Sequence, residues 1–218
     1  MHGLVAAAES LADRDDLCAV VLRARGRAFS LGLPGRVAWP PRAWPDGIAA
    51  VAGLAMPVVA ALHAEARGWG LALALASDLR VVAHGATLSL PEAAAGRLPG
   101  GGVTQRLTRL VGPARAADLL LLGTRLTGRE AAAWGLAIRA VGAPAVGATA
   151  GRLAGVLARR GPLALRYAKE AVLRAFDLPL ADGIRLEHDL YVLLQTTVDR
   201  REGVRAFLER RPPRFEAR

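Results

Sequence analysis

The chain has 218 residues, and 53% of them are hydrophobic, so it is long enough to bury a substantial core and too apolar to be disordered. Its longest apolar runs are broken well before the roughly 18 residues that a membrane-spanning helix needs, which predicts a soluble protein. The single cysteine, Cys18, excludes an intrachain disulfide and a thiolate metal cluster. The first residues lack a basic segment followed by an apolar one, so we expect no signal peptide and a cytoplasmic location.

The formal net charge of +10 comes almost entirely from arginine, because Lys169 is the sole lysine. The arginines are scattered among apolar residues and do not form a basic block with interleaved aromatics, which argues against nucleic-acid binding. A phosphate-bearing small ligand would need only a few convergent bases. The excess of Ala, Gly and Arg is also typical of a GC-rich genome, which lowers the functional weight of the charge.

In the first half of the chain, short apolar runs alternate with helical patterns. The apolar runs are predicted to be buried strands, at residues 17–22, 57–62, 79–83 and 87–90. Helices are expected at residues 4–11, 48–54 and 68–76. The segment 36–47 is rich in Pro and Trp, so it is predicted to be an irregular loop that forms a pocket wall.

Helical patterns dominate the second half. A helix over 104–111 follows the glycine loop 99–102, and an apolar helix over 114–122 ends at Gly123. Thr127 with Glu130 three residues later predicts a capping box. From Val146 to Leu208 the apolar residues recur at helical spacing. Strands that alternate with helices and then give way to helices predict an α/β fold with a helical C-terminal region.

Two glycine-rich turns stand where a strand passes into a turn or a helix. The first, AFSLGLPG at 28–35, leaves the backbone N–H of Leu33 free to donate. In the second, glycines flank Trp69 where a helix begins, and the first amides of a helix have no partner inside it. Two such amides that meet at one carbonyl would form an oxyanion hole. Ordinary tight turns use the same glycines, so the turns alone do not establish a site.

The order of motifs resembles the crotonase superfamily, the enoyl-CoA hydratases and isomerases. The matching segments are AVVLRARGRAFSLG, MPVVAAL, GWGLALALASDLRVVA, LPEAAAGRLPGGGVTQRLTRLVG, LTGREAAAWGLAIRAV and DRREGVRAFLERRPPRF. The resemblance implies an α/β crotonase-like spiral of ββα units. It implies a core over residues 1–145 without the family's opening strands and coenzyme loop, a helical trimerisation region over 146–218, and assembly into homotrimers or hexamers.

The resemblance also implies a site for a coenzyme A thioester, with the carbonyl between the amides of Leu33 and Trp69. The thioester is the substrate, and no cofactor is expected. The family's two glutamates fall on Ala72 and Glu92. Alanine cannot hold or deprotonate water, so ordinary hydration is not expected. Members that keep only the second acid resemble isomerases, in which one carboxylate moves a proton from C2 to C4.

Glu92 follows Pro91 in an apolar neighbourhood, which favours a raised pKa. A glutamate after proline is also common at the start of a helix. The substrate pocket that the resemblance implies is formed by Leu31, His63, Gly68, Ala72, Pro91 and Gly100. The four histidines are dispersed without ligand spacing, so no metal site is expected.

Two alternatives stay open. A relative with little or no catalysis, serving as a pseudoenzyme or a binding or structural partner, is indicated by Ala72, by the bulky Trp69 and by the absent opening strands. The protein could instead catalyse another crotonase reaction, such as decarboxylation or thioester cleavage. That reaction would use the same oxyanion hole, with a different group as the proton source. In each case the expected small-molecule partner is an acyl-CoA, with neither nucleic acid nor membrane involved.

Overall fold

The computed structural model describes residues 2–32 and 46–218. Its centre is a parallel sheet in the order β1-β2-β4-β7, formed by β1 (Val20–Arg23), β2 (Val58–Leu62), β4 (Leu79–Ala83) and β7 (Arg139–Val141). Every residue of β2 is buried, as a central parallel strand covered on both faces requires. The predicted α/β fold is confirmed, with its apolar runs in the middle of the sheet.

A second, smaller sheet lies beside the first. It has the order β3-β5-β6 and consists of β3 (Ala66–Arg67), β5 (Thr87–Ser89) and β6 (Leu126–Thr127). β3 pairs parallel with β5, and β5 pairs antiparallel with β6. Gly68, the residue after β3, donates its N–H to Ser89 O at 2.9 Å. This small sheet therefore determines where the following helix begins.

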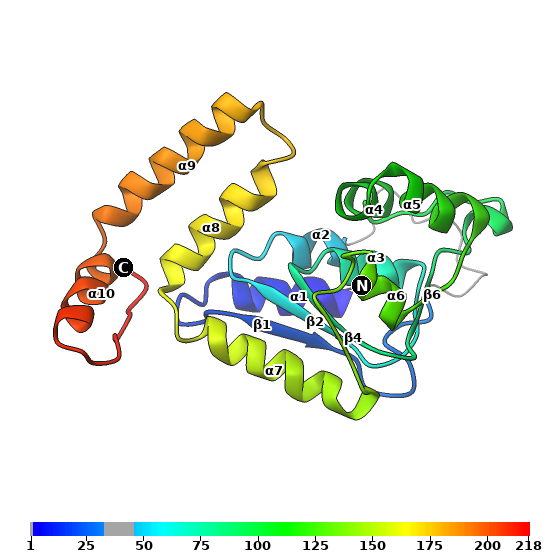
Figure 1. The fold of residues 1–218 in the computed structure, drawn as a ribbon, viewed down its shortest axis with the longest axis horizontal. Coiled ribbons are helices and arrows are strands. Elements are labelled where there is room, and N and C mark those ends of the chain that lie inside the picture. The colour runs from blue at the N-terminus through cyan, green and yellow to red at the C-terminus, as the bar shows by residue number, and fades with distance from the viewer. Residues whose placement is uncertain (1, 33–45) are drawn as a thin grey trace.

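The helices of the core pack on both sides of the central strands. Figure 1 shows α7 on one side and α2 and α3 on the other. The core helices and helical turns are α1 (His2–Ala12), α2 (Gly47–Ala52), α3 (Trp69–Leu75), η1 (Ala93–Ala95), α4 (Val103–Val111), α5 (Pro113–Ala117), η2 (Asp118–Leu122), α6 (Gly128–Ala133), η3 (Ala143–Ala145) and α7 (Val146–Leu157). One apolar cluster joins the sheet to most of them, including Val146 and Ala150 of α7. Helix α7 thus packs with the core, and the boundary at residue 145 stays a prediction.

Three C-terminal helices extend away from the sheet as an arm. They are α8 (Pro162–Arg174), α9 (Leu180–Gln195) and α10 (Val198–Leu208), and Figure 1 shows α8 and α9 side by side. The arm is held to the core through Lys169, whose Nζ donates to Leu54 O at 2.7 Å, to Met56 O at 3.1 Å and to Asp78 Oδ2 at 2.8 Å. Asp78 Oδ2 also accepts the N–H of Val58, so one buried contact joins α8 to the central strands.

The last residues of the chain lie against α10. Asp199 accepts the N–H groups of Glu216 and Ala217, and Glu202 accepts bonds from Arg205, from Arg211 and from the N–H of Arg214. These bonds, chiefly those from Arg211 and Arg205, hold the pKa of Glu202 far below its usual range. The C-terminal segment is thereby held in place by two buried carboxylates.

Most of the elements expected from the sequence are confirmed, including the capping box at Thr127 and the C-terminal helices. The helical segment expected over 114–122 is confirmed, including its end at Gly123, but α5 ends at Ala117 and the segment continues as a wider π-type turn, which hydrophobic spacing does not reveal. Gly47 belongs to α2 and not to the loop, since Asp46 caps that helix. Residues 36–45 of that loop lie outside the described residues. Within the described residues, no helix is long and apolar enough to cross a membrane.

Candidate active site

The two glycine-rich turns meet in the structure. Phe29 and Ser30 both donate their N–H groups to Glu65 O at 3.0 Å, and Ser30 O accepts the N–H of Arg67 at 2.9 Å. Gly32 has a φ of +82°, and a Cβ atom on it would lie 3.0 Å from Arg67 O and 3.8 Å from Trp69 N. The first turn therefore runs directly against the start of α3. Leu33, the next residue and the predicted amide donor, lies outside the described residues.

Glycines in the second turn allow this close approach. A Cβ atom on Gly70 would lie 2.4 Å from Ser30 Cβ, so only glycine fits between the turn and the helix. Gly68 has a φ of +53°, and its carbonyl accepts the first bond of α3, from the N–H of Ala72. Trp69 is the first residue of the helix, and its N–H has no acceptor within the helix.

Glu92 reaches this helix start from the other side. The residue is only 8% exposed and lies just before the 3-10 turn η1. Its Oε1 lies over Gly68, where an added Cβ atom would be 2.2 Å away. Among the residues that the structure describes, its Oε2 has no hydrogen-bond partner. Burial raises the pKa of Glu92, although its own backbone N–H and the charges of Arg97 and Arg67 oppose the increase.

Ala72, the position that the resemblance assigns to a second acid, has apolar neighbours. Ala72 is 1% exposed, and a Cβ atom on the neighbouring Gly101 would lie 3.2 Å from Ala72 Cβ and 2.6 Å from Ile48 Cδ1. The carbonyl of Gly101 accepts a bond of 2.6 Å from Arg106 Nη1, which holds the glycine loop. Glu92 is thus the acid that the structure places at the start of α3.

The predicted pocket residues fall into two groups. Gly68, Ala72 and Gly100 gather around the start of α3, where Gly100 lies against the indole of Trp69, and Pro91 directly precedes Glu92. Leu31 is 62% exposed, between Ser30 and Gly32 of the first turn. His63 is bonded through Nε2 to Gly26 O at 3.0 Å, so its ring is engaged with the turn that follows β1. A pocket role for Leu31 and His63 stays a prediction.

Comparison with known proteins agrees with this geometry. The family model for enoyl-CoA hydratase/isomerase matches residues 1–218. The chain belongs to the enoyl-CoA hydratase/isomerase family. It is 42% identical over 159 residues to YngF of Bacillus subtilis, which carries an enoyl-CoA hydratase/isomerase designation, and 41% identical over 170 residues to the mitochondrial methylglutaconyl-CoA hydratase of Rattus norvegicus. These matches cover 72% and 76% of the chain.

Solved structures of this family confirm the crotonase fold. An enoyl-CoA hydratase from Bacillus anthracis superposes with a TM-score of 0.92 at 32% identity, covering 100% of this chain and 88% of that one. Against the relatives matched by sequence, however, this family member spans 61% of the Bacillus subtilis protein and 54% of the rat enzyme.

Two residues that shape the candidate site of this protein were not expected from its sequence. Ile48 reaches Gly101 because Asp46 caps α2 and holds the amides of Ile48 and Ala49. Arg106 holds the glycine loop from within α4, and burial lowers its pKa, while Asp46 opposes this. An aspartate before GIAAVA signals the cap, and an arginine four residues after Gly102 signals the loop contact.

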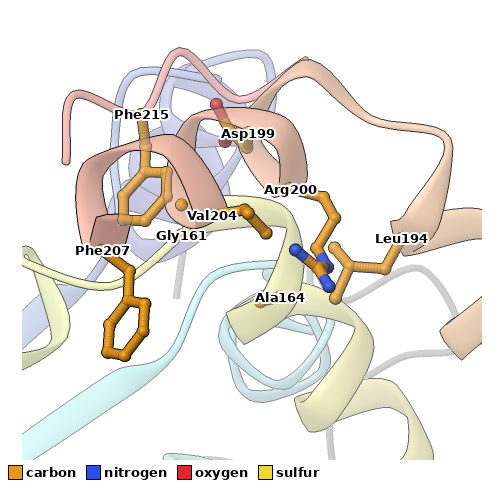
Figure 2. Close-up of a pocket in the computed structure, with 9 residues that line it drawn as sticks. Gly161, Ala164, Leu194, Asp199, Arg200, Val204, Phe207 and Phe215 are labelled. Atoms are coloured by element: carbon orange, nitrogen blue, oxygen red, sulfur yellow. The ribbon is translucent and has the colours of Figure 1, made fainter. Parts of the chain in front are cut away.

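A pocket of about 350 Å³ lies in the C-terminal arm of this protein. The residues that line it are far in sequence from Glu92. Figure 2 shows its lining: Gly161, Ala164, Leu194, Asp199, Arg200, Val204, Phe207 and Phe215. Asp199 is engaged by the C-terminal segment, and the remaining lining is mostly apolar. No group of His, Cys, Asp or Glu able to hold a metal occurs within residues 2–32 and 46–218.

Proposed function

We propose that this protein moves the double bond of an enoyl-CoA thioester, with Glu92 as the single base that transfers the proton. The observation that carries the proposal is the buried Glu92 carboxylate, whose Oε2 lacks a partner among the described residues and which lies over Gly68 at the start of α3. The apolar surroundings of Ala72 support isomerisation over hydration, because hydration needs a second group to hold and activate water.

In the proposed reaction, the thioester oxygen of a 3-enoyl-CoA accepts a hydrogen bond from the N–H of Trp69, with the N–H of Leu33 as the second donor. Glu92 removes a proton from C2, and the electron pair passes into a dienolate whose negative oxygen the two donors stabilise. The protonated Glu92 then returns the proton at C4, and the double bond lies between C2 and C3. The proton removed at C2 is the one added at C4, so no cofactor is needed.

The main alternative is a relative that binds an acyl-CoA without converting it. The observation that favours it is the indole of Trp69, which packs on Gly100 beside the proposed oxyanion hole. Decarboxylation or thioester cleavage would use the same hole with a different leaving group.

The direct test is to incubate the protein with a 3-enoyl-CoA, and separately with a 2-enoyl-CoA, and to identify the products by chromatography and mass spectrometry. We expect the 3-enoyl-CoA to become the 2-enoyl-CoA, with little 3-hydroxyacyl-CoA formed from either substrate. In D₂O the product should retain part of the substrate hydrogen at C4, since one carboxyl group carries it. Calorimetric binding of both thioesters without any conversion would support the inactive relative and contradict the proposal.

We also propose that the chain assembles into a homotrimer or hexamer through the C-terminal arm. Supporting this, the arm exposes large apolar side chains: Val172, Leu173, Phe176, Leu180, Ile184, Tyr191, Leu193, Phe207 and Leu208. Exposed apolar area of this kind is typical of a protein interface. Light scattering after size exclusion should give three or six times the mass of the chain, and Leu180→Asp, at an 80% exposed position, should lower that mass. A monomeric wild-type protein would contradict the proposal.

A further inference from the structure

We infer that the indole of Trp69 restricts the proposed acyl-CoA site to short acyl groups. The inference rests on the proposed function, since it assumes that the thioester is bound at the start of α3. It concerns a side chain of this protein, whereas the proposed oxyanion hole uses only the backbone of the same residue.

The indole of Trp69 is close in sequence to the residue that Glu92 faces. Gly68 and Trp69 are consecutive, and the α-carbon of Gly68 lies beneath the Glu92 carboxylate, with an added Cβ atom 2.2 Å from Oε1. The ring of Trp69 therefore belongs to the same helical turn as the point that Glu92 faces. An acyl group with its C2 at Glu92 would therefore start beside Gly68, the neighbour in sequence of the residue that carries the indole.

The indole of Trp69 packs against the glycine loop. A Cβ atom on Gly100 would lie 2.8 Å from Trp69 Cζ2, 3.3 Å from Cη2 and 3.6 Å from Cε2, so the indole rests directly on the glycine loop. The loop is itself held, because Gly101 packs on Ile48 and Ala72 and its carbonyl accepts the bond from Arg106. The indole thus packs on a loop that other contacts hold in place, so it has little freedom to move when an acyl chain binds.

The consequence concerns chain length. Each methylene that is buried in a pocket adds binding free energy, so an open pocket binds longer acyl chains more tightly. The indole on Gly100 is a large rigid ring, carried by the residue that directly follows the glycine facing Glu92. Butanoyl and hexanoyl groups should fit in front of the Trp69 indole. The additional methylenes of longer chains should add no binding affinity.

The test uses binding, so that it does not depend on turnover. Wild type, Trp69→Ala and Trp69→Phe are titrated with butanoyl-, hexanoyl-, octanoyl- and decanoyl-CoA by calorimetry. We expect the ratio of octanoyl to butanoyl affinity to increase at least tenfold in Trp69→Ala, and by less in Trp69→Phe. The matched control is Trp134→Ala, which removes another partly buried indole from the same core, one that packs against Arg115, and should keep the wild-type ratio.

The outcomes separate this inference from the proposed function. An unchanged ratio in folded Trp69→Phe and Trp69→Ala would overturn the inference, even if the wild type isomerises 3-enoyl-CoA. A raised ratio in a protein that isomerises nothing would support the inference while the isomerase proposal fails. If the wild type bound none of the four thioesters, both would be overturned. Trp69→Phe keeps an aromatic ring on Gly100, so it provides the answer if Trp69→Ala does not fold.

Discussion

Replacing Glu92 with glutamine should lower kcat for 3-enoyl-CoA isomerisation by roughly a hundred to ten thousand times, the usual contribution of a positioned general base. The amide has the same size and cannot remove a proton from C2, so the fold and the thioester affinity should change little. Steady-state assays of the purified variant with 3-enoyl-CoA measure the effect. The control is Glu65→Gln, whose partly exposed side chain pairs with Arg125 at 3.6 Å.

The pH profile gives an independent check on Glu92. Only the ionised carboxylate removes a proton, and burial raises its pKa. Isomerase activity should therefore fall as pH decreases through that pKa, with the midpoint above the value of about 4.3 of an ordinary glutamate. The variant should lose this limb of the profile. If Glu92→Gln kept most of the wild-type rate, or if the limb persisted in it, another residue would be the base.

Replacing Lys169 with methionine should lower the free energy of unfolding by about 3 kcal/mol, the lower part of the range for removing one partner of a buried ion pair. The side chains of Lys169 and Asp78 are 8% and 19% exposed, so the loss leaves a poorly solvated carboxylate, although Asp78 keeps the N–H of Val58. Two backbone carbonyls, of Leu54 and Met56, also lose their donor. Urea denaturation followed by circular dichroism measures the change.

Two companion variants test this explanation. Arg185→Met removes an exposed pair with Asp182 and should change stability by less than about 1 kcal/mol, because solvent screens that pair. Adding Asp78→Asn to Lys169→Met should recover part of the loss, since no uncompensated charge then remains. An effect of Lys169→Met no larger than that of Arg185→Met would show that the contact between α8 and the core contributes little.

Local patterns in the chain explain why so much of the fold was predictable. The buried strand β2 is a continuous apolar run, β4 is apolar except for Arg80, and the helix after Thr127 is marked by its capping box. The strands β3 and β6 have two residues each, and β7 has three. Such short strands show no recognisable alternation of apolar and polar residues. They form because strands far away in the sequence pair with them.

The candidate site shows the same division. Glu92 and Ala72 could be identified from the order of motifs, because each stands in a recognisable segment. The positions of Ile48 and Arg106 against Gly101 could not, since they depend on how α2 and α4 pack. Likewise the contact between Trp69 and Gly100 joins residues 31 positions apart, and only the folded chain brings them together.

The sequence by itself determined the family, the α/β architecture and the identities of residues 72 and 92, because these are properties of local pattern and residue identity. The tertiary structure decided that Glu92 is buried with an oxygen unpartnered among the described residues, and that Ala72 is buried against Gly101. It also decided that the indole of Trp69 rests on the glycine loop. Burial, pKa and pocket shape arise from atoms that distant segments bring together, which residue order does not specify.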